Sequence, residues 1–124
     1  MLEQPSGVAL LQCARDVLKN NVLPLLSGDA KRDVLMVMNA MFIAQRETEL
    51  GSTPEEAEKK SLSTLLDVLV VDLKQANRVL GARIRAGKVD PGTEEYFTVL
   101  AHLRQTGRNR LQVSNPKVLK AESA

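Results

Sequence analysis

Few side chains in this sequence have the types and spacing needed for catalysis. The chain has one histidine, His102, and one cysteine, Cys13. On a helical wheel His102 points away from the apolar stripe of its segment, so we expect a solvated histidine rather than a general base. Cys13 lies just off an apolar stripe, so we expect a buried, inert thiol. No GxSxG, P-loop or dinucleotide-binding motif occurs. The sequence argues against an enzyme and predicts no catalytic residue.

Acidic residues provide no metal site either. Glu55, Glu56 and Glu58 open a predicted helix, where the helix dipole favours carboxylates. No ExxH pair, the ligand spacing of helical metal sites, occurs in the sequence. One cysteine cannot form a disulfide or a cysteine metal cluster within the chain. We therefore expect no metal and no cofactor.

Three polar residues fall on apolar helix faces and form the candidate ligand site. Asn39 and Arg46 are seven residues apart and share one stripe of a helix, and Arg104 falls between Phe97 and Leu111 on its own wheel. A buried charge must be paired and hydrogen-bonded. A structural network that fixes helix register meets this need, and so does a pocket for an anion or a small ligand. We favour the network and retain Asn39, Arg46 and Arg104 as the candidate ligand-binding residues.

The charge distribution is uneven along the chain. Residues 1–73 carry a net charge of −4, and residues 74–124 carry +6. Packing of neighbouring helices explains this pattern, although a basic surface can also attract an anionic partner. No aromatic residues interleave the basic ones for base stacking, so we do not expect nucleic-acid binding. No apolar run is long enough for a membrane span, and the N-terminus lacks the features of a signal peptide. We expect a cytoplasmic protein that does not bind membranes.

The elements that hold these side chains are predicted to be helices. Hydrophobic residues make up 44% of the 124 residues and aromatic residues 2%, so the core must be aliphatic, and Leu and Ala favour helix. Length and composition predict one all-α domain over residues 1–124, with a frayed tail over 117–124. Short loops predict a mainly antiparallel bundle. The four expected helices run from about Val8 to Leu26, from Asp29 to Gly51, from Thr53 to Ala86, and from Asp90 or Thr93 to just before Asn115-Pro116.

The third helix has the clearest start and the least certain middle. Thr53 is the expected N-cap, with Pro54 at the first helical position and Glu56 completing a capping box. We expect one long helix, and the alternative is a kink or split around Asp67–Val71, where the VLVV run is β-branched.

Two apolar surfaces predict contact with another protein. The middle of the second helix, VLMVMNAMFIA, is apolar on nearly every side, which is typical of a central helix or an oligomer interface. Its three methionines fit core filling better than a promiscuous groove. Val68, Val71 and Val79 lie opposite the main stripe of the third helix, and exposed strips of this kind tend to be covered. We therefore expect a homodimer.

Much of the chain resembles a family of bacterial domains of unknown function. The similar segments are VALLQCARDVLKNNVLPLL, MNAMFIAQRETELG, LGARIRAGKVD and LAHLRQTGRNRLQVSNPKVL. The matching positions are Asn39, Arg46, Glu47, Leu50, Gly51, Ile84, Arg85, Gly87, Leu103, Asn115 and Pro116. The sequence departs from the family pattern where a glycine-containing break is expected, since LLDVLVVDL runs on. That departure leaves the number of helices open by one.

The resemblance carries no catalytic residues. Domains of the family occur alone or attached to aminoglycoside-phosphotransferase-like kinases, often near genes of acyl-CoA metabolism. The resemblance therefore implies an accessory role near such a kinase or pathway. Our leading hypothesis is a non-enzymatic accessory or protein-interaction domain. The alternative is a helical bundle that binds a small ligand or an anion and is linked to a phosphotransferase or acyl-CoA pathway.

Overall fold

The computed structural model describes residues 4–123, and in that range it contains six α-helices and no strand. The all-α class is confirmed. The expected number of four helices is wrong, because the third predicted helix is split and the C-terminal tail is helical. The helices are α1 (Gly7–Val17), α2 (Gly28–Leu50), α3 (Thr53–Leu66), α4 (Leu73–Arg85), α5 (Tyr96–Ser114) and α6 (Pro116–Ser123).

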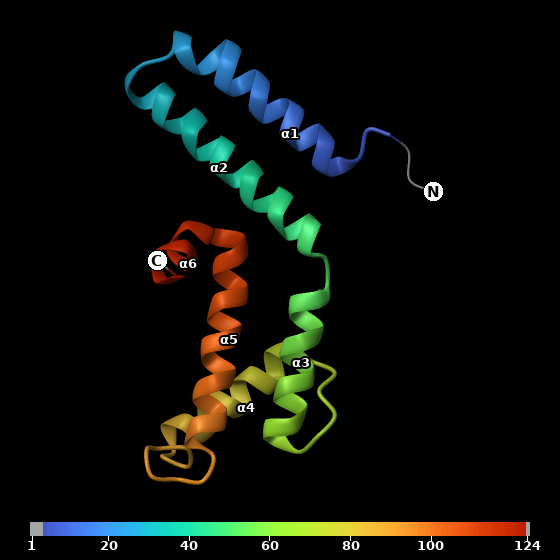
Figure 1. Ribbon diagram of the computed structural model, residues 1–124, viewed down its shortest axis with the longest axis vertical. Helices are drawn as coiled ribbons and strands as arrows, with labels where there is room; N and C mark the ends of the chain where they lie inside the picture. Colours follow the sequence, from blue (N-terminus) through green and yellow to red (C-terminus); the bar gives the residue numbers. More distant parts are fainter. Residues whose placement is uncertain (1–3, 124) are drawn as a thin grey trace. The chain divides into compact units, whose positions relative to one another are not determined.

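The helices form two compact units, divided between Gly51 and Ser52. In the first unit α1 and α2 pack against each other as a helical hairpin (Figure 1). In the second unit α3 packs against both α4 and α5, and α6 packs against α5. The assignment of residues 1–124 to a single domain stays a prediction.

The first helix begins as expected and ends earlier than expected. Ser6 is the N-cap, and its hydroxyl accepts a hydrogen bond from the Ala9 amide at 3.2 Å. After Val17 the chain continues as a π-helical turn over Leu18–Val22 and a 3₁₀ turn over Leu23–Leu25. Pro24 has no amide hydrogen and cannot continue the α-helical ladder, which accounts for the change of helix type.

Each end of α2 lies within one residue of the prediction, but the helix has little burial. It ends at Leu50, and its C-cap Gly51 has a φ of +61°, in the region that glycine adopts without strain. Val34, Met38 and Met41 are half-buried, whereas Met36 and Val37 are 65% and 52% exposed. Among the described residues of the hairpin, Gln45 alone is buried.

The predicted long third helix is split, as the alternative expectation had it. α3 starts at Thr53, but Ser52 is its N-cap, so the expected cap at Thr53 is wrong by one residue. The helix ends because Asp67 adopts a left-handed conformation with φ +54°. The Ser63 hydroxyl then accepts a hydrogen bond from the Val70 amide at 3.0 Å, which turns the chain back over the end of α3.

The valine strip expected on the third helix does not exist as a helix face. Val68 and Val71 lie in the loop 67–72 and are 58% and 77% exposed. Val79 lies on α4, where it is half-buried and packs against the core. The break at Asp67 separates the three residues, because a helical wheel holds only while the helix continues.

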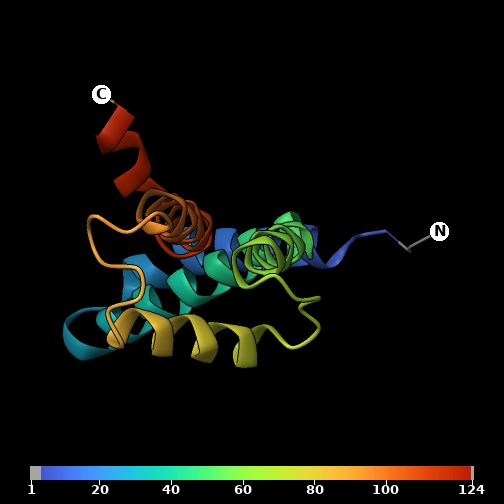
Figure 2. The same ribbon diagram turned by 90° about the horizontal axis from the view of Figure 1, so that it is seen from below.

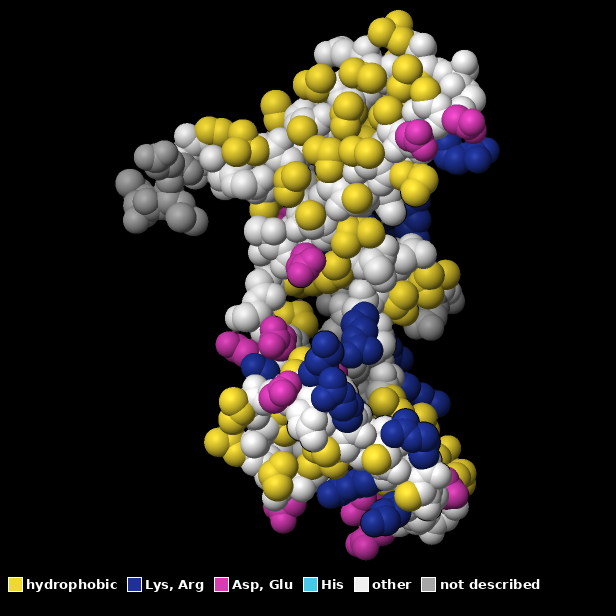
Figure 3. All heavy atoms as spheres, turned by 180° about the vertical axis from the view of Figure 1, so that it is seen from behind, with side chains coloured by type: hydrophobic (Ala, Val, Ile, Leu, Met, Phe, Trp, Pro, Cys, Tyr) yellow, Lys and Arg dark blue, Asp and Glu magenta, His cyan; other side chains and the backbone are white. Residues whose placement is uncertain are grey.

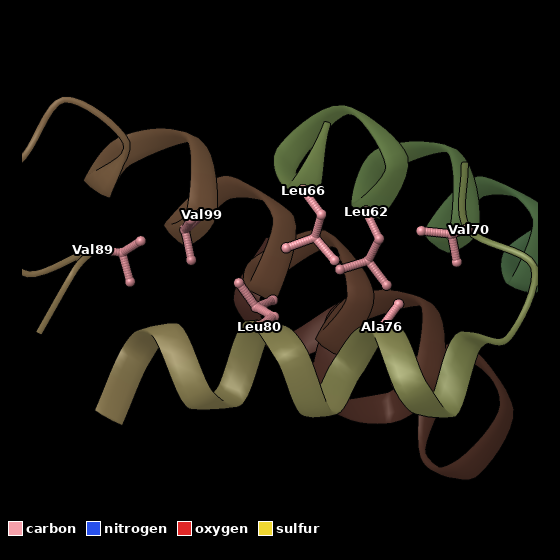
Figure 4. Packing of buried hydrophobic residues seen from close by; sticks show 7 residues of the cluster. All are labelled: Leu62, Leu66, Val70, Ala76, Leu80, Val89 and Val99. Atoms are coloured by element: carbon pink, nitrogen blue, oxygen red, sulfur yellow. The ribbon is translucent and has the colours of Figure 1, made fainter. Parts of the chain in front are cut away.

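The hydrophobic core of the second unit lies where α4 crosses α3 and α5. Seen along their axes, α3 and α5 lie side by side and α4 runs across both of them (Figure 2). Leu62 and Leu66 of α3 meet Ala76 and Leu80 of α4, and Val99 comes from α5 (Figure 4). The remaining core residues, Val70 and Val89, come from the connecting loops.

The C-terminal part differs from the prediction at both ends. Turns precede α5, which starts at Tyr96 and not at Asp90 or Thr93, because the Thr93 amide and hydroxyl both bond the Asp90 carbonyl at 3.0 and 2.7 Å. α5 ends at Ser114, as the Asn115-Pro116 pair predicts. Most of the tail over 117–124 belongs to an additional helix, α6, which Pro116 opens at a position where proline is well tolerated, and residue 124 lies outside the described residues. Fraying of this tail stays a prediction.

Candidate functional site

The candidate site of the second unit is a polar network centred on His102. The His102 side chain is 6% exposed, and its Nδ1 lies 2.6 Å from the Ser61 hydroxyl. His102 comes from α5 and Ser61 from α3, so this hydrogen bond joins two helices. The expectation of a solvated histidine is wrong. The buried face of α5 carries Val99, His102 and Thr106, which recur at spacings of three and four.

Glu58 forms a second polar cluster, whose charges act on His102 and whose hydrogen bonds reach α4. Its side chain is 10% exposed, and its Oε1 accepts hydrogen bonds from Asn77 Nδ2 and Arg110 Nη2, both at 3.3 Å. Glu58 lies on α3, Asn77 on α4 and Arg110 on α5. One carboxylate therefore ties together all three helices that pack around the core.

The ring of His102 has a lowered pKa. Burial is the largest cause, because removal from water disfavours the imidazolium. The negative charge of Glu58 raises the pKa and the positive charge of Arg110 lowers it. The pKa of His102 therefore lies below its ordinary value of 6.5, and the ring is neutral at pH 7.

The Ser61–His102 pair has the chemical types of a nucleophile and a base. A hollow of about 370 Å³ beside α3 is lined by Ser61, Thr64 and Thr98, among others, and His102 does not line it. The imidazole faces the helix interface rather than this hollow. The geometry suits a hydrogen-bond network that fixes the positions of the helices.

The three candidate ligand-binding residues are not gathered within either unit. Asn39 and Arg46 belong to the hairpin and Arg104 to the second unit. Asn39 and Arg104 are exposed, so their expected inward placement is wrong. For Arg104 the reason is that Phe97 is 76% exposed and the buried stripe of α5 runs through Val99 instead. The assignment of these three residues to a ligand stays a prediction.

Arg46 belongs to a polar cluster of the hairpin. The cluster also contains Arg15, which is not among the site residues predicted from the sequence. The guanidinium carbons of Arg15 and Arg46 lie 3.8 and 4.3 Å from the centre of the Phe42 ring. Arg15 Nη1 also donates to Gln45 Oε1 at 3.1 Å, while its buried Nε has no hydrogen-bond partner. Gln45 Nε2 donates to Glu49 Oε1 at 3.3 Å. Gln12 and Arg15 are three residues apart and therefore share one face of α1. This spacing is the sequence pattern from which the cluster could have been predicted.

The hairpin also exposes much of its apolar surface. Leu35, Met36 and Val37 of α2 are 46%, 65% and 52% exposed, and Leu25 is 82% exposed. Figure 3 shows one face of the hairpin on which hydrophobic side chains far outnumber charged ones. Cys13 is exposed as well, so the expected core thiol is wrong. Cys13 is exposed because α1 turns its half-buried residues, such as Leu11 and Arg15, toward α2.

Two further properties of the described residues bear on function. No helix within residues 4–123 is long and apolar enough to cross a membrane. No group of three or more His, Cys, Asp or Glu side chains in the described part of the chain is arranged to hold a metal ion.

Comparison with known proteins places the chain by family alone. No curated protein and no solved structure matches it. Residues 24–118 match a family described as a domain of unknown function, DUF6285. The match spans α2 to α5 and begins at Pro24, after α1. Since it covers most of the chain, the protein belongs to the DUF6285 family.

Proposed function

We propose that the chain is a non-enzymatic accessory domain that binds another protein through the apolar surface of α2. The observation that carries this proposal is the exposure of Leu35, Met36 and Val37 on a helix whose unit buries no hydrophobic residue among those described. Contiguous exposed apolar side chains are typical of protein–protein contact sites. The segment 34–44 of α2, which contains these residues, has no charged side chain, in agreement with the depletion of charged residues at interface cores.

The proposed partner is a phosphotransferase-like kinase. This part of the proposal rests on the family resemblance of the sequence segments, which implies a bacterial domain that occurs alone or attached to such kinases near acyl-CoA metabolism. The accessory domain can use the same α2 surface whether it is attached to the kinase or separate from it. A linker only converts binding between two chains into a contact within one chain.

Photocrosslinking in the native host tests the proposal. A photoreactive residue replaces Met36, and a matched control carries it at Lys31, an exposed polar position of the same helix. We expect the Met36 position, and not the Lys31 position, to crosslink to a phosphotransferase-like kinase. Crosslinks that join position 36 exclusively to residues 52–124 of its own chain would contradict the proposal, because the hairpin surface would then be an internal contact. Crosslinks exclusively to a second copy would exclude the kinase.

A second candidate function is anion binding in the hairpin, and the two arginines at Phe42 favour it. Guanidinium groups bind carboxylate and phosphate in bidentate fashion, and Asn39 lies on the same side of α2 as Phe42 and Arg46. This site retains Asn39 and Arg46 from the sequence prediction and uses Arg15 in place of Arg104.

Thermal melts with and without inorganic phosphate test this second function. Phosphate should raise the melting temperature of the unmodified protein by mass action and should leave that of Arg46→Ala unchanged. Arg104→Ala is the matched control, since Arg104 is exposed and lies in the other unit, and it should respond to phosphate like the unmodified protein. Equal responses of all three proteins would exclude the site.

A further inference from the structure

The second unit carries an apolar groove between the loop 67–72 and one flank of α4. The groove has a volume of about 390 Å³. Leu66, Val70 and Ala76 line it and are buried, and Val79 lines it and is half-buried. The groove is therefore formed by the hydrophobic core itself, opened to solvent at the point where α3 ends.

The loop beside the groove exposes its aliphatic side chains to solvent. Val68, Leu69 and Val71 are 58%, 86% and 77% exposed, and all three line the groove. The loop is held in place, since the Val68 amide bonds the Ser63 carbonyl at 3.3 Å and the Val70 amide bonds the Ser63 hydroxyl at 3.0 Å. A fixed loop that presents three aliphatic side chains is suited to contact with another apolar surface.

The two charged residues of the groove have opposite signs and lie at opposite ends of α4. Asp72 caps the N-terminus of the helix, with Oδ1 accepting from the Lys74 and Gln75 amides at 3.0 and 3.2 Å. Arg83 lies in the last turn, where its Nη1 donates to the Leu65 carbonyl at 3.5 Å. Eleven helical positions separate them, which corresponds to about 16 Å along the axis.

This arrangement of charge is complementary to itself. When two α4 helices lie antiparallel around a two-fold axis near Asn77 and Arg78, Asp72 of each copy lies beside Arg83 of the other. The same axis places Ala76 of one copy opposite Val79 of its partner copy, which allows close approach. Self-complementarity of one patch is the requirement for a two-fold symmetric dimer.

We propose that a second copy of this chain covers the groove, with Leu69 of each copy entering the groove of the other. The inference goes beyond the proposed function, since it uses the residues 66–83 and a different occupant. Ten residues line the groove, fewer than the ~20–30 residues per side of a standard stable interface. The dimer is therefore weak, and its dissociation constant falls in the micromolar range or above.

Sedimentation velocity of the full chain from about 1 μM to about 1 mM tests the inference. Leu69→Ser should raise the dissociation constant at least tenfold without altering the thermal melt, because Leu69 is 86% exposed within its own chain. Leu25→Ser is the matched control, since Leu25 is 82% exposed but belongs to the hairpin, and it should leave the constant within about twofold.

Charge reversal tests the two-fold arrangement. Asp72→Lys and Arg83→Glu should each weaken self-association, because each places like charges together at both ends of α4. A mixture of the two variants should associate again, since opposite charges are restored in the mixed dimer. A monomer up to about 1 mM, or equal constants for Leu69→Ser and Leu25→Ser, would overturn the inference. Failure of the mixture to associate would overturn the antiparallel pairing. All these outcomes are independent of crosslinking from Met36 and so of the proposed function.

Discussion

Ser61 and His102 share a 2.6 Å hydrogen bond in the interface between α3 and α5. The partners are 41 residues apart in sequence, so no local pattern pairs them. Glu58 bonds Asn77 and Arg110 in the same region. Buried polar groups of this kind stabilise a fold less through their own strength than through the cost of leaving one of them unpaired. The network therefore selects one arrangement of the three helices.

Truncation of Ser61 should be costly. Ser61→Ala leaves His102 Nδ1 without its hydroxyl partner and should lower the free energy of unfolding by roughly 1–3 kcal/mol. Ser114→Ala removes an exposed hydroxyl that bonds only the Arg110 carbonyl and should change it by less than about 0.5 kcal/mol. Urea denaturation of both variants gives the comparison, and equal losses would show that the Ser61 bond contributes nothing specific.

The lowered pKa of His102 predicts a loss of stability in mild acid. Below about pH 6.5 the unfolded chain binds a proton at this residue while the folded chain does not, so unfolding becomes more favourable as the pH falls. The loss stops once the pH lies below the folded pKa, because both states are then protonated. His102→Gln removes this titration. Denaturant melts between about pH 7 and about pH 5 should therefore show a smaller pH dependence for the variant, and an equal one would disprove the assignment.

The candidate site was hard to predict because burial of polar residues depends on which helix face packs. His102 and Arg104 are two positions apart on α5, and the true buried stripe includes His102 and leaves Arg104 exposed. A helical wheel that takes Phe97 and Leu111 as the buried face predicts the reverse, with Arg104 buried and His102 exposed. Because only 2% of the residues are aromatic, the single exposed Phe97 is enough to rotate the predicted buried face of α5.

At the scale of elements, the loop 67–72 depends on the left-handed residue that ends α3. Asp67 has φ +54°, and short polar residues tolerate this region better than branched ones. Asp67→Val should therefore lower the free energy of unfolding by about 1–2 kcal/mol. Thr64→Val is the control, since it places the same side chain at an exposed, right-handed position of α3 and should cost less than about 0.5 kcal/mol. Chemical denaturation of the pair measures the difference, and similar losses would mean that the conformation of Asp67 is not strained for valine.

Helix starts and stops that rest on one residue could be predicted from the sequence. Ser6, Gly51 and the Asn115-Pro116 pair mark ends that the structure contains. The sequence predicts the split at Asp67 only as an alternative, because the Val70–Ser63 hydrogen bond that accompanies it joins residues seven positions apart. The apolar run DVLVVD has no glycine or proline to announce the turn. Packing of α4 across α3 overrides the local helical pattern there.

For the whole molecule, burial is divided unequally between the two units. Every buried hydrophobic residue of the described chain lies in the second unit, from Leu62 to Val99. The hairpin buries Gln45 and otherwise leaves its residues half-buried or exposed. Two helices without a buried apolar core are marginal in water, because helix stability in proteins comes mostly from packing of an apolar face.

This division predicts that the units differ as isolated fragments. Residues 52–124 alone should give a helical circular dichroism spectrum and a cooperative thermal melt, because they retain all seven buried core residues. Residues 1–51 alone should melt without a cooperative transition and should gain helicity only when a partner covers α2. The full chain is the reference for both measurements. A disordered 52–124 fragment would show that the second unit needs the hairpin to fold, and residues 1–124 would then form one interdependent domain. A fragment 1–51 that melts cooperatively as a monomer would mean that the exposed side chains of α2 do not need a partner, and it would remove the main support for the proposed interaction surface.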